Sequence, residues 1–208
     1  MSFRTYRAVD LLIWLGIMLL AELLTSYAAN TWLPGISFAV SLTFPILIIV
    51  YMRWGALGAI NAGIGGFMVC LFSDITGGQA MTAERIITSV VGHLCLTVAP
   101  LIFILFGKGD IKKGRATTRE KWYMTFLYVG IMYLAMNVGF AAAESITLQR
   151  EFFPLTLRYL SFNGVTLIFS VVVAIVVRKT EGLFEDQKTY MFRLERERLE
   201  QRQKNNHA

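Results

Sequence analysis

Polar side chains occur at a few positions inside the long apolar stretches of this chain, and they are the residues best suited to chemistry. They are Glu22, Glu84, Arg85, His93, Asn137, Glu144, Arg158 and Asn163. A charge near the centre of a bilayer costs about 2.5–3.5 kcal/mol, so each of these residues indicates a cavity, a polar partner or a function. Because acidic and basic groups both occur, the set favours an amphoteric or multiply hydrogen-bonded ligand over a simple anion.

The spacing of these residues predicts that several of them converge. Asn137 and Glu144 are seven residues apart, so they share one helix face and lie about 10 Å apart along its axis. Tyr159 and Asn163 are four residues apart and share a face likewise. Most polar residues lie in the half of each stretch that is farther from the basic loops, and the other halves are almost wholly apolar. This asymmetry predicts a pocket that opens on one side above a sealed floor.

A purely structural interpretation of the same residues is internal pairing. Glu22 would then pair with Arg85, Glu144 would pair with Arg158, and His93 would bond a backbone carbonyl. Buried charged and polar groups in a bilayer are commonly satisfied in this way. Packing requires fewer polar groups than the eight present here, so the set as a whole favours a binding site.

Signatures of enzymes are missing from the sequence. It contains no GxxxxGK[ST] phosphate loop, no HExxH metal motif and no GxSxG elbow. The two histidines are His93 and His207, and the two cysteines, Cys70 and Cys95, are interpreted as packing residues within apolar stretches. We therefore expect no catalytic residue, no bound metal and no cofactor, and no nucleotide hydrolysis by this chain.

Six apolar stretches, each long enough to cross a bilayer, organise the sequence. A crossing helix needs about 20 apolar residues, and the stretches are approximately Val9–Ala29, Ile36–Met52, Gly55–Phe72, Arg85–Phe106, Trp122–Ile146 and Phe152–Val177. All but three of the 20 Lys and Arg residues lie before the first stretch, after the sixth or in alternate gaps. Because Lys and Arg are retained on the cytoplasmic side, we predict an all-α, six-span membrane protein with both termini inside. The charge of +6 then belongs to the inner membrane face and not to a nucleic-acid site.

The third stretch and the C-terminal tail each allow more than one interpretation. Two rows of small residues at intervals of four predict either tight internal packing or docking of another membrane subunit: Gly55, Ala59 and Gly63 in one row, and Gly58, Ala62 and Gly66 in the other. Residues 1–178 are predicted to form the membrane domain and residues 179–208 a charged helix. An amphipathic helix on the cytoplasmic leaflet is the first interpretation of that tail, and a docking helix or a continuous stalk are the others.

One local pattern resembles a known family. It runs from Ser41-Leu42-Thr43-Phe44-Pro45 through an apolar run to Arg53-Trp54-Gly55-Ala56-Leu57-Gly58-Ala59, and then through a glycine-rich stretch to Asp74. With six predicted spans and a length of 208 residues, the chain resembles the substrate-binding S components of energy-coupling factor (ECF) vitamin transporters. The local pattern covers only about 35 residues, whereas the overall architecture covers residues 9–177.

The resemblance implies a binding protein in a bacterial plasma membrane that captures a small water-soluble vitamin. In that family the pocket is shaped by outer loops, which correspond here to residues 30–35, 73–84 and 147–151. A partner T subunit and two cytoplasmic ATPases, which use the ATP, complete the transporter. The family's T-subunit contact is often an Ala-x-x-x-Ala pair on the first helix, but here the nearest spacing, Ala21 to Thr25 to Ala29, lies in the outer half. The long charged tail is a second departure.

The sequence therefore favours a membrane-embedded capture subunit for a small, vitamin-like metabolite. Its predicted ligand residues are Glu22, Trp32, Asp74, Gln79, Arg85, His93, Asn137, Glu144, Arg158, Tyr159 and Asn163. Its predicted docking residues are Ala21, Gly55, Gly58, Ala59, Ala62, Gly63 and Gly66. Two alternatives stay open: a membrane sensor that signals through the tail, and a scaffold of an envelope-assembly complex.

Overall fold

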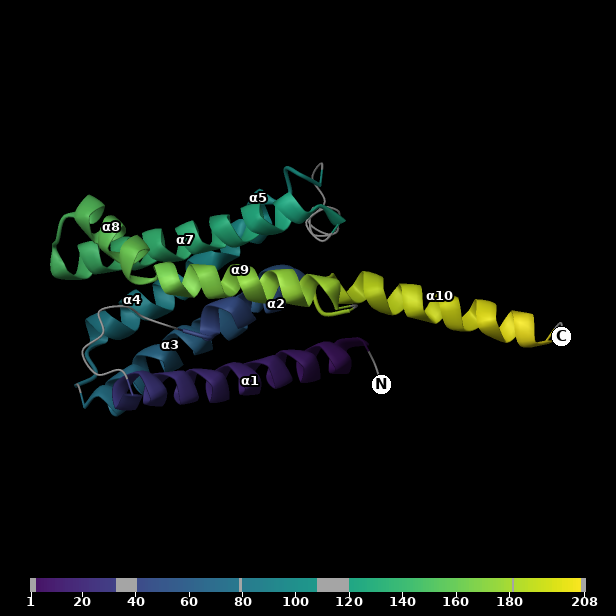
Figure 1. Ribbon diagram of the computed structural model, residues 1–208, viewed down its shortest axis with the longest axis horizontal. Helices are drawn as coiled ribbons and strands as arrows, with labels where there is room; N and C mark the ends of the chain where they lie inside the picture. The colour runs from purple at the N-terminus through teal and green to yellow at the C-terminus, as the bar shows by residue number, and fades with distance from the viewer. Residues whose placement is uncertain (1–2, 33–40, 79, 108–119, 181, 207–208) are drawn as a thin grey trace.

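A computed structural model describes residues 3–32, 41–78, 80–107, 120–180 and 182–206 of the chain. All regular secondary structure among these residues is helical. The helices are α1 (Phe3–Trp32), α2 (Thr43–Trp54), α3 (Gly58–Gly77), α4 (Ala83–Leu94), α5 (Val98–Ile102), α7 (Trp122–Leu148), α8 (Phe152–Phe162), α9 (Gly164–Lys179) and α10 (Gln187–Asn206). Short 3₁₀ turns at Gly55–Leu57 and Cys95–Thr97 follow α2 and α4. We call the end of the bundle where α1 and α7 begin the inner end, and the opposite end the outer end (Figure 1).

Four helical stretches of the described chain are long and apolar enough to cross a membrane. They are Phe3–Trp32, Thr43–Gly77, Ala83–Ile102 and Trp122–Leu148, and α8 with α9 makes a fifth if this pair, bent by 52°, is one span. Large apolar side chains cover the outside of the bundle, such as Leu12, which is 65% exposed, and Ile168, which is 69% exposed. An apolar exterior of this kind is compatible with a protein surrounded by lipid.

The stretch Thr43–Gly77 reverses its direction at Gly55. The Thr43 backbone amide bonds the Glu22 carboxylate at 3.2 Å, and Arg53 bonds Asp10, so α2 runs along α1 toward the inner end. The α3 helix then runs back, because the Asn61 amide donates to the Leu11 carbonyl at 3.0 Å and the Asn30 amide donates to the Thr76 hydroxyl at 2.7 Å. Gly55 has φ 59°, a conformation that glycine adopts without strain. The two helices therefore form an antiparallel pair beside α1.

The sixth predicted stretch is interrupted and is not one straight helix. Asn163 separates α8 from α9, and the two helices meet at an angle of 52°. Its backbone amide still bonds the Tyr159 carbonyl at 3.0 Å, and the Asn163 carbonyl accepts from Leu167 at 3.1 Å. The break therefore bends the chain and keeps these two backbone bonds.

The centre of the bundle, toward its inner end, is filled by large side chains. Tyr51, Phe103, Tyr128 and Met132 are each fully buried in one apolar cluster. The Tyr51 hydroxyl bonds the Thr97 hydroxyl at 2.8 Å, so the polar atom of this buried tyrosine has a hydrogen-bond partner. This cluster joins α2, α5 and α7 into one solid layer.

Small residues of α3 allow close helix contacts within the bundle. A methyl group at Gly66 would lie 2.8 Å from the Ser89 carbonyl oxygen and 3.0 Å from the Val90 Cα, both on α4. At Gly58 it would lie 2.9 Å from the Tyr51 ring. Ala62 is fully buried. The row Gly58, Ala62 and Gly66 thus serves internal packing, and the prediction that it docks a separate subunit is wrong for these three residues.

The other predicted docking residues are placed differently. Gly55 is buried at the reversal of the chain, so it too is used internally. Ala21, Ala59 and Gly63 are half-buried. Docking of a partner subunit at these three positions stays a prediction.

Replacing Gly66 with alanine is expected to destabilise the bundle by about 1–3 kcal/mol, because the added methyl group meets backbone atoms that cannot move aside. Gly63→Ala is the matched control, since its methyl group would lie 3.6 Å from a Leu94 methyl, an ordinary contact. Alanine is favoured over glycine inside a helix by about 0.5–1 kcal/mol, so this control should be neutral or slightly stabilising. Thermal unfolding in detergent measures both effects, and equal midpoints would contradict the packing described here.

The C-terminal helix α10 extends away from the inner end of the bundle (Figure 1). Because successive helical residues are rotated by about 100°, Tyr190, Met191 and Phe192 point in three different directions. Nearly all other residues of α10 are charged or polar. The helix therefore lacks the continuous apolar face that a helix lying on a membrane needs. The predicted amphipathic character is therefore wrong, and the docking helix and the stalk stay open as predictions.

Candidate functional site

A cavity of about 430 Å³ lies at the outer end, between α3, α4, α7 and α8. Five of the predicted ligand residues line it: Arg85, Glu144, Arg158, Tyr159 and Asn163. Glu84, Thr88 and Ser89 of α4, with Cys70 and Ser73 of α3, add further polar groups. Val69, Phe140, Leu148 and Phe162 supply the apolar part of the wall. We call this space the outer cavity.

Two buried carboxylates beside the outer cavity are each held by arginine. Asp74 is 2% exposed and pairs with Arg85 at 2.6 Å. Glu144 is 6% exposed and accepts a bond from Arg150 at 2.7 Å and one from the Tyr159 hydroxyl. Arg158 lies 3.6 Å from the same carboxylate. The charges of Asp74 and Glu144 are thus balanced by neighbouring arginines. Arg85 and Arg158 are themselves partly exposed and line the cavity.

The floor of the outer cavity contains an amide pair. The Asn163 side-chain amide donates to the Asn137 side-chain oxygen at 2.7 Å, and the Asn137 amide donates to the Tyr133 carbonyl at 2.8 Å. Asn137 is fully buried, so it supports Asn163 and does not itself line the cavity. This chain of bonds joins the bend between α8 and α9 to the middle of α7.

Aromatic rings form one wall of the outer cavity. The Phe140 and Tyr159 rings have their centroids 5.3 Å apart and are tilted by 34°. The Arg158 guanidinium carbon lies 5.4 Å from the centroid of the Tyr159 ring. A guanidinium beside aromatic faces suits a small molecule that carries a negative group on an apolar or ring-shaped body.

Glu22 lies apart from the outer cavity and has a structural role. One of its carboxylate oxygens accepts bonds from the Ser41 hydroxyl at 2.8 Å, the Thr43 hydroxyl at 3.0 Å and the Thr43 amide at 3.2 Å. Thr43 is the first residue of α2, where a negative charge stabilises the exposed amides of a helix start. Glu22 is therefore a cap supplied by a neighbouring helix and does not line the outer cavity, so a role in ligand binding stays a prediction.

Three other predicted ligand residues do not line the outer cavity. Trp32 is 74% exposed at the end of α1, and His93 is buried, with Nδ1 2.7 Å from the Ser89 carbonyl oxygen. Asp74 contributes only through its bond to Arg85. Gln79 lies outside the described residues.

The internal pairs expected from the sequence are partly present. Glu144 is close to Arg158, and His93 contacts a backbone carbonyl, as expected. Arg85 pairs with Asp74 and not with Glu22. Arg150, which the sequence places in a turn, reaches back to Glu144 from the outer end. The polar groups therefore satisfy one another, but a ligand-sized space remains between them.

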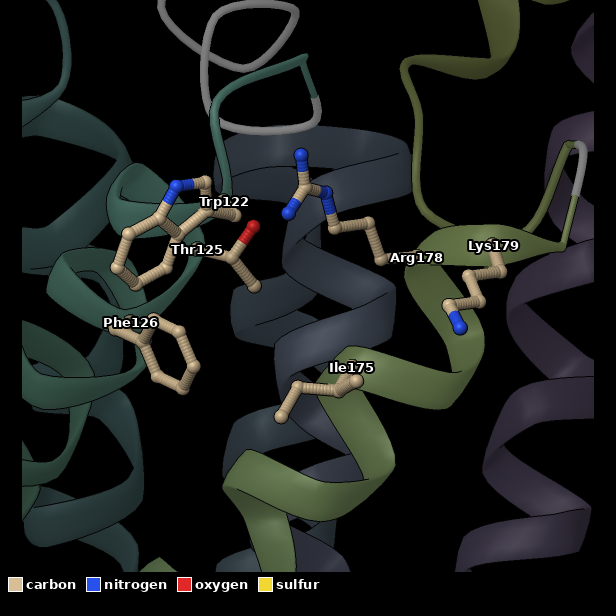
Figure 2. A pocket seen from close by; sticks show the side chains of 6 residues that line it. All are labelled: Trp122, Thr125, Phe126, Ile175, Arg178 and Lys179. Atoms are coloured by element: carbon tan, nitrogen blue, oxygen red, sulfur yellow. The ribbon is translucent and has the colours of Figure 1, made fainter.

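A second cavity, of about 440 Å³, lies at the inner end between α7 and α9 (Figure 2). It contains none of the predicted ligand residues. Trp122, Thr125 and Phe126 of α7 line one side, and Ile175, Arg178 and Lys179 of α9 line the other. We call it the inner groove.

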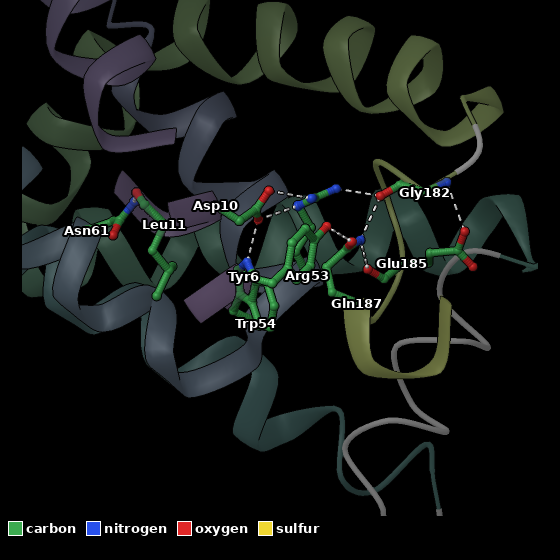
Figure 3. A network of polar contacts seen from close by, with 9 residues as sticks. All are labelled: Tyr6, Asp10, Leu11, Arg53, Trp54, Asn61, Gly182, Glu185 and Gln187. Carbon is green, nitrogen blue, oxygen red and sulfur yellow. Dashed lines mark hydrogen bonds and ion pairs between the residues drawn. The ribbon is translucent and has the colours of Figure 1, made fainter. Parts of the chain in front are cut away.

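The inner end contains a buried polar network that the sequence did not predict (Figure 3). Arg53, in the last turn of α2, donates to both oxygens of Asp10 on α1, at 3.0 and 2.7 Å. The Trp54 indole donates to the same carboxylate at 2.6 Å. Arg53 is 6% exposed, so Arg53 and Asp10 form a buried, bidentate ion pair.

The same arginine binds the segment that leads into α10. Its guanidinium also donates to the Gly182 carbonyl, which in addition accepts from the Gln187 amide at 2.7 Å. The Tyr6 hydroxyl donates to the Gln187 side-chain oxygen at 2.9 Å. Gly182 has φ 75°, and a side chain there would meet the Tyr190 ring at 2.9 Å. The base of α10 is thus fastened to α1 and α2. We call the residues Tyr6, Asp10, Arg53, Trp54, Gly182 and Gln187 the inner junction.

The described residues contain no group of three or more His, Cys, Asp or Glu side chains placed to hold a metal ion. Comparison of the chain with protein-family models, with curated proteins and with solved structures gives no match. The interpretation of the chain therefore depends on its own geometry.

Proposed function

We propose that this chain is a membrane-embedded capture protein for a small, charged metabolite, which it binds in the outer cavity. The observation that carries the proposal is a space of about 430 Å³ lined by both arginine and glutamate side chains, between helices whose other residues are largely apolar. Binding cavities of about 300–1,000 Å³ hold drug-sized molecules. The ligand expected here carries a carboxylate or phosphate for the arginines, a donor group for the acids, and a ring against Phe140 and Tyr159.

The finer form of the proposal is an S component of an ECF-type importer with six membrane crossings. Six crossings follow if α2 and α3 count as two, since α3 runs back along α1, and if α4 with α5 and α8 with α9 count as one each. Both termini would then lie in the cytoplasm, where the Lys and Arg residues of the inner end would be retained. A T subunit and two ATPases would supply the power, and this chain would carry no catalytic residue or cofactor.

The test is native mass spectrometry of the protein purified in mild detergent from its own membranes. We expect one small molecule bound at 1:1 stoichiometry, released only when the protein is activated to unfold. Its mass and fragmentation identify it. Protein that carries no small molecule, and that binds none from a panel of vitamins and amino-acid derivatives, would contradict the proposal.

A second candidate function, membrane sensing, is favoured by the inner junction. Arg53 joins α1, α2 and the start of α10 through buried bonds, so a shift of α2 would be transmitted to α10. Limited proteolysis of α10 with and without the bound molecule separates the two candidates. A sensor predicts a ligand-dependent cleavage rate, whereas a capture protein predicts the same rate in both states.

A further inference from the structure

The inner groove between α7 and α9 combines a cationic mouth with an apolar interior. Arg178 and Lys179 are the last two residues of α9, and Trp122 is the first residue of α7. Phe126 and Ile175 lie about one turn deeper along the same helices. Figure 2 shows the Arg178 guanidinium directed into the space between the two helices, at the level of Trp122. No acidic side chain lines the groove among the described residues.

The position of Arg178 is fixed by the fold. One of its terminal nitrogens donates to the Glu120 carbonyl oxygen at 2.7 Å, just before α7 begins. This bond holds the guanidinium across the groove and not out toward solvent. Lys179 lines the same cavity and is exposed. Arg178 therefore places one positive charge inside the groove, and Lys179, whose side chain leaves α9 on the side away from α7, places a second at its edge (Figure 2).

The depth of the groove matches the boundary between headgroups and hydrocarbon. Trp122 is 64% exposed, and tryptophan at a helix end favours the headgroup level. Ile175, 42% exposed, and Phe126, 37% exposed, leave the groove open toward the surrounding lipid. A basic recess between two spanning helices at this depth has the chemistry that holds anionic headgroups.

We propose that the inner groove is a binding site for one anionic phospholipid. The phosphate binds the Arg178 guanidinium in the groove, Lys179 adds a second positive charge at the edge, and the acyl chains run along Phe126 and Ile175 past the Trp122 ring. Charge complementarity selects an anionic headgroup, and the apolar interior selects a lipid over a water-soluble phosphate. The site rests on the membrane insertion included in the proposed function but is independent of the outer cavity.

The test uses native mass spectrometry of the delipidated full chain in detergent, titrated with phosphatidylglycerol or phosphatidylcholine. The wild-type chain is expected to retain one phosphatidylglycerol and to bind phosphatidylcholine much more weakly. Removing two charges at the site, in R178Q/K179Q, is expected to weaken phosphatidylglycerol binding by about 30-fold. Lys179→Gln alone should weaken it by about fivefold. Because Arg178 also bonds the Glu120 carbonyl, this single variant keeps the test valid if the double variant is unstable.

The matched control is R196Q/R202Q, which removes two positive charges from exposed positions of α10. It should bind phosphatidylglycerol as the wild type does, and equal weakening in both double variants would overturn the site in favour of general charge attraction. Equal retention of the two lipids by the wild-type chain would overturn it as well. Displacement of the lipid by excess glycerol 3-phosphate would assign the groove to a soluble phosphate instead.

The same spectra keep the two proposals apart. A small molecule in the outer cavity adds its own mass, which R178Q/K179Q should leave unchanged, because both residues lie at the opposite end of the bundle. Loss of lipid without loss of the small molecule supports the inner groove. Loss of the small molecule alone bears only on the outer cavity.

Discussion

Replacing Arg53 with methionine should lower the free energy of unfolding by about 3–5 kcal/mol, because Asp10 is then left as a buried charge without its counter-ion. The side chains of Arg53 and Asp10 are only 7% and 12% exposed, so water cannot replace the lost partner. The Gly182 carbonyl loses its bond to Arg53 in the same substitution. The base of α10 should therefore loosen as the bundle destabilises.

Thermal unfolding and limited proteolysis of α10 measure the two effects of Arg53→Met. Arg193→Gln is the matched control, since Arg193 pairs with Glu185 at 3.2 Å but its side chain is 39% exposed. Glu185 is only 10% exposed but keeps its bond from the Gly182 amide, so the loss should be smaller than for Arg53→Met. In a double-mutant cycle, adding Asp10→Asn to Arg53→Met should cost much less than Asp10→Asn alone, because the two residues interact directly. Additive costs would contradict the buried pair.

Replacing Arg158 with glutamine should weaken binding of the ligand proposed for the outer cavity by about 10–150-fold. A hydrogen bond to a charged group is worth about 1.5–3 kcal/mol, and Arg158 offers such a bond from the wall of the outer cavity. Its side chain is 59% exposed, so the substitution should change the free energy of unfolding by less than about 1 kcal/mol. Loss of affinity with unchanged stability is the expected result.

Arg150→Gln is the matched control for Arg158→Gln. Both arginines lie beside Glu144, at 2.7 Å for Arg150 and 3.6 Å for Arg158, and both are more than half exposed. Only Arg158 lines the outer cavity. Isothermal titration with the molecule identified by mass spectrometry should show near-normal affinity for Arg150→Gln. Equal losses in the two variants would mean that charge near Glu144, and not contact with the ligand, sets the affinity.

The charged part of the outer cavity was predictable from the sequence, for an electrostatic reason. Charged residues such as Arg85, Glu144 and Arg158 cannot face hydrocarbon, so their helices must turn them toward one another. The seven-residue interval between Asn137 and Glu144 placed both on the inward face of α7, as the structure confirms, since both are buried. Helical periodicity and the cost of burying a charge were together sufficient to predict that these residues face the inside of the bundle.

The inner junction was not predictable by the same reasoning. Asp10 and Arg53 are 43 residues apart in sequence, and each lies near a predicted helix end where contact with headgroups explains a charge equally well. Their pairing depends on how α1 and α2 align, which the sequence pattern does not specify. The role of Glu22 was missed for a related reason, because a cap supplied by another helix has no local signature.

The direction of α10 shows a further limit. The sequence predicted a charged helix after residue 178, and the structure has one from Gln187 to Asn206. Whether such a helix lies on a membrane or leaves it depends on the angular distribution of Tyr190, Met191 and Phe192 and on the anchoring of Gly182. The anchoring depends on tertiary contacts that periodicity alone does not reveal.

Among the described residues, the apolar layer formed by Tyr51, Phe103, Tyr128 and Met132 separates the outer cavity from the inner end of the bundle. If the outer cavity binds the proposed metabolite, this molecule must leave by the side from which it entered unless the whole protein reorients. Occupancy at equilibrium thus tracks the concentration in a single compartment. An importer of this kind would need a partner to drive release of the molecule on the inner side. In a sensor of this kind, cytoplasmic metabolites would not compete for the outer cavity.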